Sequence, residues 1–304
     1  MQLDSAQLDT FAAVIDEGSF DAAARRLQIT PSAVSQRIKA MESRLGHVLV
    51  QRTKPALATE AGEAVLRLAR QVSLLEVEAI AAVKGKLEGL RLPIAVNADS
   101  LNNWFLPVLF AVPQELVTAF DLRQEDQDHS AELLRNGTVL AAVTADPRPV
   151  QGCRVQPLGK MRYLSIATPE FADRWLTGRP LAEALEKAPM VVFNSKDMLQ
   201  HRLLRKVTRR RIDPPIHSIP APGPFARSIR LGLGWGMIEE ERVVDDLAEG
   251  RLVEVAQGKY VDVPLYWQHW KLDSAVLDAL TAAVLQAAEA GLRGGRTPKA
   301  TQKT

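Results

Sequence analysis

The sequence has 304 residues, of which 46% are hydrophobic and 24% charged, a composition typical of a globular chain with more than one core. Its formal net charge of +2 does not exclude a nucleic-acid ligand, because a small overall balance can conceal a local basic surface. The single cysteine, Cys153, excludes an intramolecular disulfide and a cysteine-pair metal site. No apolar run reaches the roughly 18 residues of a membrane helix, and Asp4 and Asp9 stand where a secretory signal would carry lysines, so we expect a cytoplasmic chain with no membrane partner.

Three short helices are predicted within the first fifty residues. Apolar residues recur at helical spacing over residues 8–15, and Gly18 follows at a position where a left-handed residue ends a helix. Ser19 is placed to cap a second helix, whose small alanines allow a neighbouring helix to approach closely. Thr30 is a good cap for a third helix that begins with Pro31. The predicted buried stripe of this third helix consists of Val34, Ile38, Met41 and Leu45.

The opposite face of the third helix is polar and predicts a contact with DNA. Serine and glutamine side chains near its N-terminus can bond to base edges in a major groove, while a lysine further along contacts phosphate. Between Ser19 and Lys54 the sequence has seven basic residues against two acidic ones. A polar face that is merely solvated is the alternative, and this cationic three-helix context argues against it.

A wing is predicted after Gly46, from the apolar stretch 47–50 and the basic segment 51–55, although an ordinary exposed hairpin would show the same pattern. Residues 1–58 are therefore predicted to form a winged helix-turn-helix domain. The predicted DNA-binding residues are Arg25, Thr30, Ser32, Ala33, Ser35, Gln36, Lys39, Arg52 and Lys54.

A long linker helix is predicted over residues 59–89, capped by Thr59 and uninterrupted by proline to about Lys86. Apolar residues along it alternate by three and four, which is the spacing of a coiled-coil seam. We expect this seam to pair with the same helix of a second subunit in a homodimer or homotetramer, and packing on the chain's own C-terminal part is the alternative. The predicted dimerisation residues are Val65, Leu68, Val72, Leu75 and Ala79.

The remainder of the chain predicts two interleaved α/β lobes. A late strand at 264–270 and a helix at 274–290 have no third domain to join, so by analogy with periplasmic binding proteins they return to complete the first lobe. Lobe 1 is then 90–163 with 264–292, lobe 2 is 164–263, and 293–304 is a disordered basic tail. The remaining predicted strands are Leu92–Asn97, Phe120–Gln124, Val139–Thr144, Tyr163–Ala167, Met190–Phe193 and Gly236–Ile238.

Candidate ligand-binding residues follow the ends of these strands, where open α/β sheets bind ligands. Asp99 and Ser100 open a helix whose free backbone N–H groups, with the serine hydroxyl, suit a ligand α-carboxylate. A carboxylate at 125–126 or at 144–146 suits an ammonium or guanidinium group, and Phe193 and Asn194 are expected to face them from the other lobe. Each residue taken singly is equally explained as a helix cap or an exposed turn residue. The candidate effector-binding residues are Asp99, Ser100, Glu125, Asp126, Thr144, Asp146, Phe193 and Asn194.

Other chemistries find little support in the sequence. The five histidines show no paired metal-ligand spacing, and we expect no metal and no catalytic residues, since no nucleophile, base and oxyanion site can be assembled. The basic run 205–211 is most simply a solvated face and has no assigned role.

The sequence also carries a family resemblance. Residues 11–66, with an alanine-rich second helix, SAVSQRI at 32–38, ESRLG at 42–46 and Arg52 ahead of TEAG, resemble the DNA-binding domain of LysR-type transcriptional regulators. Three later stretches resemble the LysG/ArgP branch, regulators of lysine or arginine export that respond to basic amino acids. These stretches are VNADSLNNWFLPVL, RQEDQDHSAELLRNG and VQGCRVQPLGKMRYLSIATPEF.

The resemblance implies a regulator that binds operator DNA, takes lysine or arginine as its small-molecule effector and controls an exporter gene, with RNA polymerase as a candidate partner. It implies no cofactor and no enzymatic activity. The alternative function is an architectural or replication-control DNA-binding protein with little promoter specificity.

Overall fold

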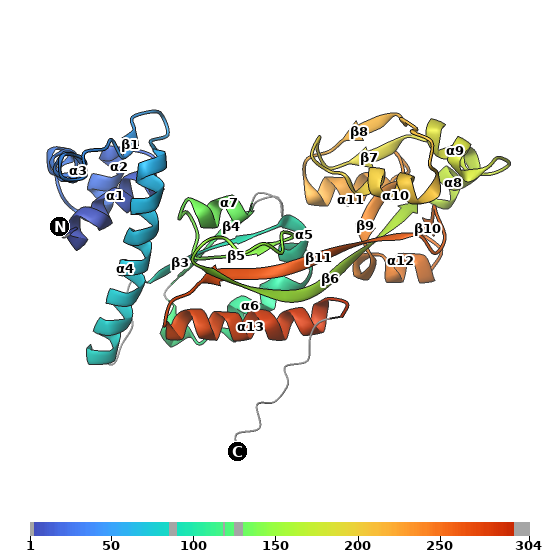
Figure 1. The fold of residues 1–304 in the computed structure, drawn as a ribbon. Helices are drawn as coiled ribbons and strands as arrows, with labels where there is room; N and C mark the ends of the chain where they lie inside the picture. Colours follow the sequence, from blue (N-terminus) through green and yellow to red (C-terminus); the bar gives the residue numbers. More distant parts are fainter. Residues whose placement is uncertain (1–2, 85–89, 118, 125–129, 295–304) are drawn as a thin grey trace, which may run out of the picture. The chain divides into compact units, whose positions relative to one another are not determined.

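The computed structural model describes residues 3–84, 90–117, 119–124 and 130–294 of the chain (Figure 1). These residues fall into two compact units, each assembled from three separate stretches. The first unit takes Met1–Asn97, Phe105–Pro157 and Tyr266–Ala287. The second unit takes Ala98–Trp104, Leu158–Leu265 and Ala288–Thr304.

The N-terminal part of the first unit is a helical head with a short hairpin. Its elements are α1 (Ser5–Glu17), α2 (Phe20–Leu27), α3 (Pro31–Leu45), β1 (Val50–Gln51), β2 (Leu57–Ala58) and α4 (Glu60–Lys84). The predicted caps are confirmed, because the Ser19 and Thr30 side chains accept hydrogen bonds from backbone N–H groups at the starts of α2 and α3. Gly18 and Gly46 follow α1 and α3 in the left-handed conformation, with φ of 65° and 72°.

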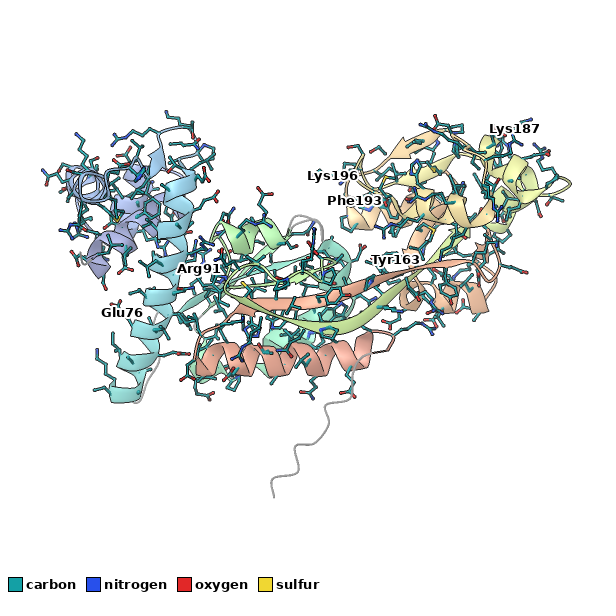
Figure 2. The ribbon with its side chains drawn as sticks, in the orientation of Figure 1. Glu76, Arg91, Tyr163, Lys187, Phe193 and Lys196 are labelled. Atoms are coloured by element: carbon teal, nitrogen blue, oxygen red, sulfur yellow. The ribbon has the colours of Figure 1, made fainter. Side chains whose placement is uncertain are left out.

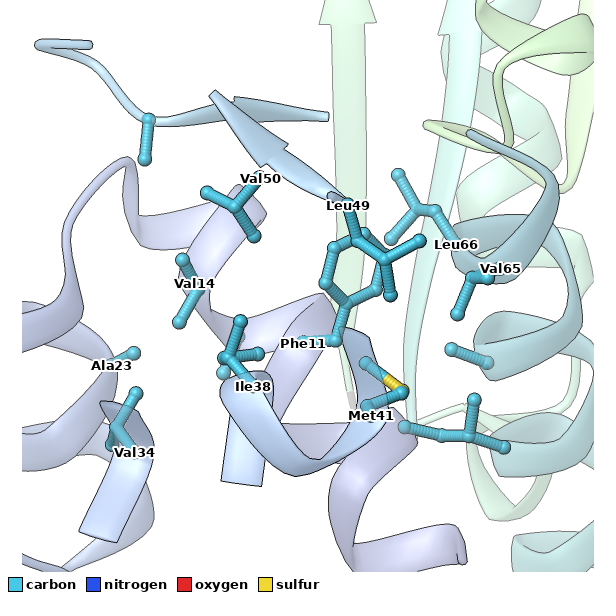
Figure 3. Packing of buried hydrophobic residues seen from close by; sticks show 14 of the residues in the cluster. Phe11, Val14, Ala23, Val34, Ile38, Met41, Leu49, Val50, Val65 and Leu66 are labelled. Atoms are coloured by element: carbon cyan, nitrogen blue, oxygen red, sulfur yellow. The ribbon is translucent and has the colours of Figure 1, made fainter. Parts of the chain in front are cut away.

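The head has a single apolar core that α4 helps to close. Figure 3 shows Phe11 of α1, Ile38 and Met41 of α3, and Leu49 packing together, with Leu66 of α4 beside them. The predicted stripe of α3 is confirmed for Val34, Ile38 and Met41, which are fully buried, while Leu45 is partly buried. The same core takes in the first turns of α4, so the linker helix begins as part of the head.

The rest of the first unit is a small sheet with helices beside it. Its elements are β3 (Arg91–Val96), α6 (Leu106–Ala111), the 3-10 turn Gln114–Leu116, β4 (Ala119–Gln124), α7 (Ser130–Arg135) and β5 (Ala141–Thr144). β3 pairs in parallel with both β4 and β5. The late strand β11 (Tyr260–Trp270) pairs antiparallel with β5, and the helix α13 (Ala275–Gly291) follows it. In Figure 1, α6 and α13 lie on one side of these strands and α7 on the other.

The second unit contains the long strand β6 (Cys153–Ala167), which pairs antiparallel with β9 (Gly236–Glu239) and with β10 (Val253–Glu254). β7 (Met190–Val192) pairs in parallel with β8 (Ile216–Ser218). A buried cluster that includes Ile166, Val191 and Ile229 holds this unit together. The remaining elements are α5 (Ala98–Ser100), the π-helix Leu101–Phe105, α8 (Pro169–Trp175), α9 (Leu181–Lys187), α10 (Leu199–Val207), α11 (Pro222–Arg230), the 3-10 turn Glu240–Arg242 and α12 (Val244–Ala248).

The structure adjusts several boundaries that the sequence predicted. β6 begins at Cys153, ten residues before the predicted start, because its first part alternates polar and apolar side chains and faces solvent on one side. The predicted lobe boundaries at 163/164 and 263/264 stay predictions, since β6 and β11 run through them without a break. The predicted tail starts too early, because Arg293 exchanges two backbone hydrogen bonds with Lys160. Its remainder from residue 295, and linker residues 85–89, lie outside the described residues.

Candidate nucleic-acid interface and effector site

The third helix of the head presents one buried face and one exposed face. Ser32, Gln36 and Lys39 are exposed, and Ser35 is half-buried. They project away from the fully buried Val34, Ile38 and Met41 that fix the helix in the head. An exposed polar stripe on a helix held rigidly from behind is the geometry that major-groove insertion requires.

The first turn of α3 uses part of the predicted contact set for its own structure. The Thr30 Oγ1 atom accepts a hydrogen bond from Ala33 N at 3.2 Å and lies 2.9 Å from Ser32 Oγ. Thr30 and Ala33 therefore form the helix cap, and only their exposed surface remains for a DNA backbone.

The wing is tied to the helices on both sides. Glu42 of α3 accepts a hydrogen bond from Leu49 N at 2.8 Å, and Ala56 N donates to Gly18 O at 2.7 Å. These bonds leave Arg52 and Lys54 exposed at the tip, with the Arg52 guanidinium 5.0 Å from the centroid of the Phe20 ring. The exposed cations of the wing are thereby held on the same rigid head as the exposed face of α3.

Two of the basic residues in the head have internal partners instead. Arg26 pairs with Asp16 at 3.2 Å, and Arg37 donates to Thr10 Oγ1 at 3.1 Å. Arg25, by contrast, is exposed at the end of α2. The local excess of positive charge seen in the sequence thus divides into structural residues and residues that can face phosphate.

The second unit contains a cluster of carboxyl groups around the half-buried Asp99. The Tyr163 hydroxyl donates a hydrogen bond to Asp99 Oδ2 at 2.6 Å (Figure 2 labels Tyr163). Tyr163 of β6 lies opposite Glu239 of β9 in the antiparallel register, so the two side chains share one face of the sheet. Glu239 is only 3% exposed, and its carboxylate lies 3.4 Å from the guanidinium of Arg242.

Burial governs the ionisation of this cluster. It raises the pKa of Glu239 from 4.5 to about 7, and the nearby charge of Asp99 adds to the effect. Burial also raises the pKa of Asp99, while the hydrogen bond from Tyr163 acts in the opposite direction. The pKa of Tyr163 lies well above its usual value, so Tyr163 is a neutral hydrogen-bond donor.

Phe193 and Asn194 belong to the same unit and reach the cluster through Asp197. Phe193 N donates to Asp197 Oδ2 at 3.0 Å, and the charge of Asp197 raises the pKa of Asp99 (Figure 2 labels Phe193). Asn194 uses its side-chain oxygen to accept a bond from Lys196 N at 2.8 Å, which closes a turn. Ser100 is fully buried next to Asp99 in the chain, and its hydroxyl has no hydrogen-bond partner among the described residues.

The other predicted effector residues are not part of this cluster. Thr144 and Asp146 belong to the first unit, where Asp146 N donates to Thr144 Oγ1 at 3.1 Å. Asp146 forms an ion pair with Arg148 at 2.8 Å, which lowers the pKa of Asp146. Glu125 and Asp126 lie outside the described residues.

Sequence reasoning missed Tyr163, Glu239 and Asp197 as site residues. Glu239 ends the apolar strand β9, so the rule that selected Asp99 at the end of β3 would have found it. Tyr163 and Asp197 carried no comparable signal, because their position depends on pairing between strands that are far apart in the sequence.

The linker helix exposes part of its predicted seam. Leu68 and Leu75 are 38% and 41% exposed, and Ala79 is exposed as well. Val65 is only 8% exposed and packs with Val72 in the core of the head. This packing, on the side of α4 that faces α1, leaves little of the Val65 side chain for an intersubunit contact, and its assignment to the seam stays a prediction. The helix also touches the effector part of its own unit, where Glu78 accepts a bond from Val276 N at 2.9 Å at the start of α13.

Two family descriptions together match most of the chain. Residues 5–63 match the bacterial regulatory helix-turn-helix proteins of the lysR family, and residues 90–289 match the LysR substrate binding domain. The transcriptional regulator LysG of Mycobacterium tuberculosis is 50% identical over 295 residues, which cover 96% of each chain. The lysine export transcriptional regulatory protein LysG of Corynebacterium glutamicum is 44% identical over 292 residues, covering 94% of this chain and 98% of that one.

Solved structures give the same relationship. ArgP from M. tuberculosis superposes with a TM-score of 0.87 at 50% identity, covering 96% of this chain and all of that one. Full-length LysG from C. glutamicum with bound effector Arg superposes with a TM-score of 0.76 at 43% identity and covers the same share of each chain. Among the described residues, no helix is long and apolar enough to span a bilayer. The chain therefore belongs to the LysR family of DNA-binding, ligand-responsive transcriptional regulators, in the branch that includes LysG and ArgP, and it is not an enzyme.

Proposed function

We propose that this regulator senses lysine or arginine in the cytoplasm and controls a gene for the export of basic amino acids. The observation that carries the proposal is the carboxyl cluster of half-buried Asp99 and buried Glu239, because two neighbouring acids beside the guanidinium of Arg242 favour a cationic ligand. The relative whose structure holds bound arginine, 43% identical over the same length, supports this choice of ligand.

Within the second unit, Asp99 would bind the ligand's cationic group, and the unpartnered hydroxyl of Ser100 would bond to its polar end. Phe193 and Asn194 would line the same site, since Phe193 is joined to the cluster through Asp197. Thr144 and Asp146 are weaker candidates, because Asp146 is already neutralised by Arg148.

On the DNA side, we propose that the exposed face of α3 enters the major groove and that Arg25, Arg52 and Lys54 contact phosphates on either side of it. Two heads would be joined in a homodimer, or in a homotetramer built from two dimers, through the exposed linker residues Leu68, Leu75 and Ala79. The ligand would act by binding one arrangement of the subunits more tightly than another, which changes how the two heads fit the operator and present it to RNA polymerase.

The test of ligand identity is calorimetry of the full chain with L-arginine and L-lysine, with citrulline and norleucine as uncharged controls of similar size. We expect binding of the basic amino acids only, and a loss of at least tenfold in affinity in Asp99→Asn, in line with roughly 1.5–3 kcal/mol for a charged hydrogen bond. Asp146→Asn should bind nearly as well as the parent chain. Equal binding of citrulline and arginine would refute the proposed cation site.

The test of the regulatory role is footprinting on the DNA upstream of an exporter gene and on random DNA at matched salt, with and without arginine. We expect a protected site on the promoter that changes its extent when arginine is added. Equal protection of random DNA would favour an architectural protein instead.

A further inference from the structure

We infer that effector binding expels a proton shared by Asp99 and Glu239, so that the pair recognises a cationic ligand by exchanging it for a proton. This inference rests on the proposed function, because it concerns how the same site takes up a basic amino acid. It assigns to Glu239 a specificity role beside that of Asp99.

The geometry of the pair favours a bound proton. Tyr163 and Glu239 are opposite each other in the register of β6 and β9, and the Tyr163 hydroxyl donates to Asp99 at 2.6 Å. The Asp99 carboxylate and the buried Glu239 carboxyl are thereby both neighbours of the Tyr163 side chain, and the charge of Asp99 raises the pKa of Glu239. Two ionised carboxylates this close together in a poorly solvated site repel each other, so the pair favours keeping one proton.

The charged and titratable groups around Asp99 and Glu239 come from several elements of the second unit. From the loop before α10, Asp197 accepts bonds from Phe193 N at 3.0 Å, Leu199 N at 3.1 Å and Gln200 Nε2 at 3.2 Å. From the turn after β9, the Arg242 guanidinium contacts both carboxyl oxygens of Glu239 at 3.4 Å, which is long for a hydrogen bond. Tyr163 of β6 is neutral. Among the described residues, these three acidic side chains therefore lie near the guanidinium of Arg242, and this excess of acids favours a cationic ligand.

A second observation indicates that a ligand completes the cluster. Ser100 is fully buried beside Asp99, and its Oγ atom has no hydrogen-bond partner among the described residues. Gln200 donates to Asp197, yet its Oε1 atom is likewise buried without a partner. Buried polar atoms are almost always satisfied in folded proteins, so these two mark contacts that a polar ligand would supply.

The exchange balances in charge. A guanidinium or ammonium group enters with one positive charge, the proton of the pair leaves to solvent, and both carboxylates become ionised around the new cation. The pKa of Glu239, about 7 in the unoccupied protein, sets the pH range of this exchange. About half of the sites carry the proton at pH 7, about nine-tenths at pH 6 and about one-tenth at pH 8. Arginine affinity should therefore be about tenfold weaker at pH 6 than at pH 8.

The experiment is calorimetry of the full chain with L-arginine at pH 6, 7 and 8, each in two buffers of different ionisation enthalpy. We expect the tenfold change in affinity and the release of about half a proton per arginine at pH 7. Glu239→Gln should abolish both the pH dependence and the proton release, because a glutamine amide does not ionise between pH 6 and pH 8. Glu240→Gln is the matched control, since Glu240 pairs with Arg293 at 2.6 Å outside the cluster and should leave both unchanged.

The outcomes separate this inference from the function on which it rests. Arginine binding with the same affinity at all three pH values and no proton transfer would overturn the inference while leaving the effector assignment intact. Absence of binding by arginine and lysine at every pH would overturn the proposed function, and the inference with it. A Glu239→Gln variant that still released a proton on binding arginine would overturn the inference alone, because the proton would then come from another group.

Discussion

A single added methyl group tests the junction between the linker helix and the wing. Gly62 lies in α4, and a Cβ atom built on it would be 2.2 Å from Leu49 O and 3.3 Å from the Cβ atom of Ala58. Because ordinary contacts of this kind are not shorter than about 3.2 Å, the Gly62→Ala variant must move a backbone segment by about 1 Å. The same Leu49 oxygen accepts a hydrogen bond from Thr59 N at 2.9 Å, which the shift would strain.

The expected cost follows from these contacts. Overpacking destabilises by about 1–3 kcal/mol and a strained hydrogen bond adds about 1, while the better helix propensity of alanine recovers about 1. We expect a net loss of about 2 kcal/mol in the head, which corresponds to about 30-fold faster opening.

Hydrogen exchange followed by mass spectrometry on residues 5–63 is the suitable assay, because all five tryptophans lie outside the head and fluorescence would not report on it. Gly223→Ala is the matched control, since Gly223 also lies in a helix and a Cβ atom there would meet nothing within 4 Å. Unchanged exchange in Gly62→Ala would refute the packing argument for this junction.

Three further predictions concern DNA binding, assembly and pH. Lys39→Ala should weaken binding to promoter DNA and to random DNA alike, and it should reduce the slope of log affinity against log salt by about 1, as measured by fluorescence anisotropy. Lys187→Ala in the second unit should leave both the affinity and the slope unchanged. Leu75→Glu should produce monomers in sedimentation experiments without destabilising the head, because Leu75 is exposed. Substitution of the buried residue in Val65→Ala should instead lower the stability of the head. A Leu75→Glu variant that remained dimeric would contradict the proposed seam. Because the folded pKa of Glu239 is raised from 4.5 to about 7, the native state binds the proton more tightly than the unfolded chain and loses stability as pH rises through that interval. Glu239→Gln should accordingly be more stable than the parent chain at pH 8, by at most about 3 kcal/mol, and no more stable below pH 4.5. Urea unfolding followed by tryptophan fluorescence measures this difference in stability. An equal gain in stability at both pH values would contradict the prediction.

The head was predictable from sequence because its structure is mainly local. Ser19 and Thr30 cap helices within three residues of themselves, and Gly18 and Gly46 end helices where their left-handed conformation is needed. The buried stripe of α3 follows from helical spacing alone. Local signals did not decide the fate of Val65, because a three-and-four spacing fits both a seam between subunits and a contact with α1.

The carboxyl cluster was predictable only in part, because it depends on contacts between residues that are far apart in the sequence. Asp99 and Phe193 could be chosen because each follows a recognisable strand. The partnership of Tyr163 with Glu239 depends on an antiparallel register between residues 76 positions apart, which no local pattern specifies. The proton on the pair depends in turn on burial, which is a property of the assembled unit.

The return of β11 to the first unit has a consequence for synthesis on the ribosome. β5 is complete at Thr144, yet the stretch of β11 that pairs with it begins at Tyr266 and is translated more than a hundred residues later. Until then one edge of β5 has unpaired backbone groups, and the apolar face that Trp267 covers in the finished chain is open. The core of the helical head is complete once α4 has been synthesised, so the head can fold while the later strands have not yet been translated.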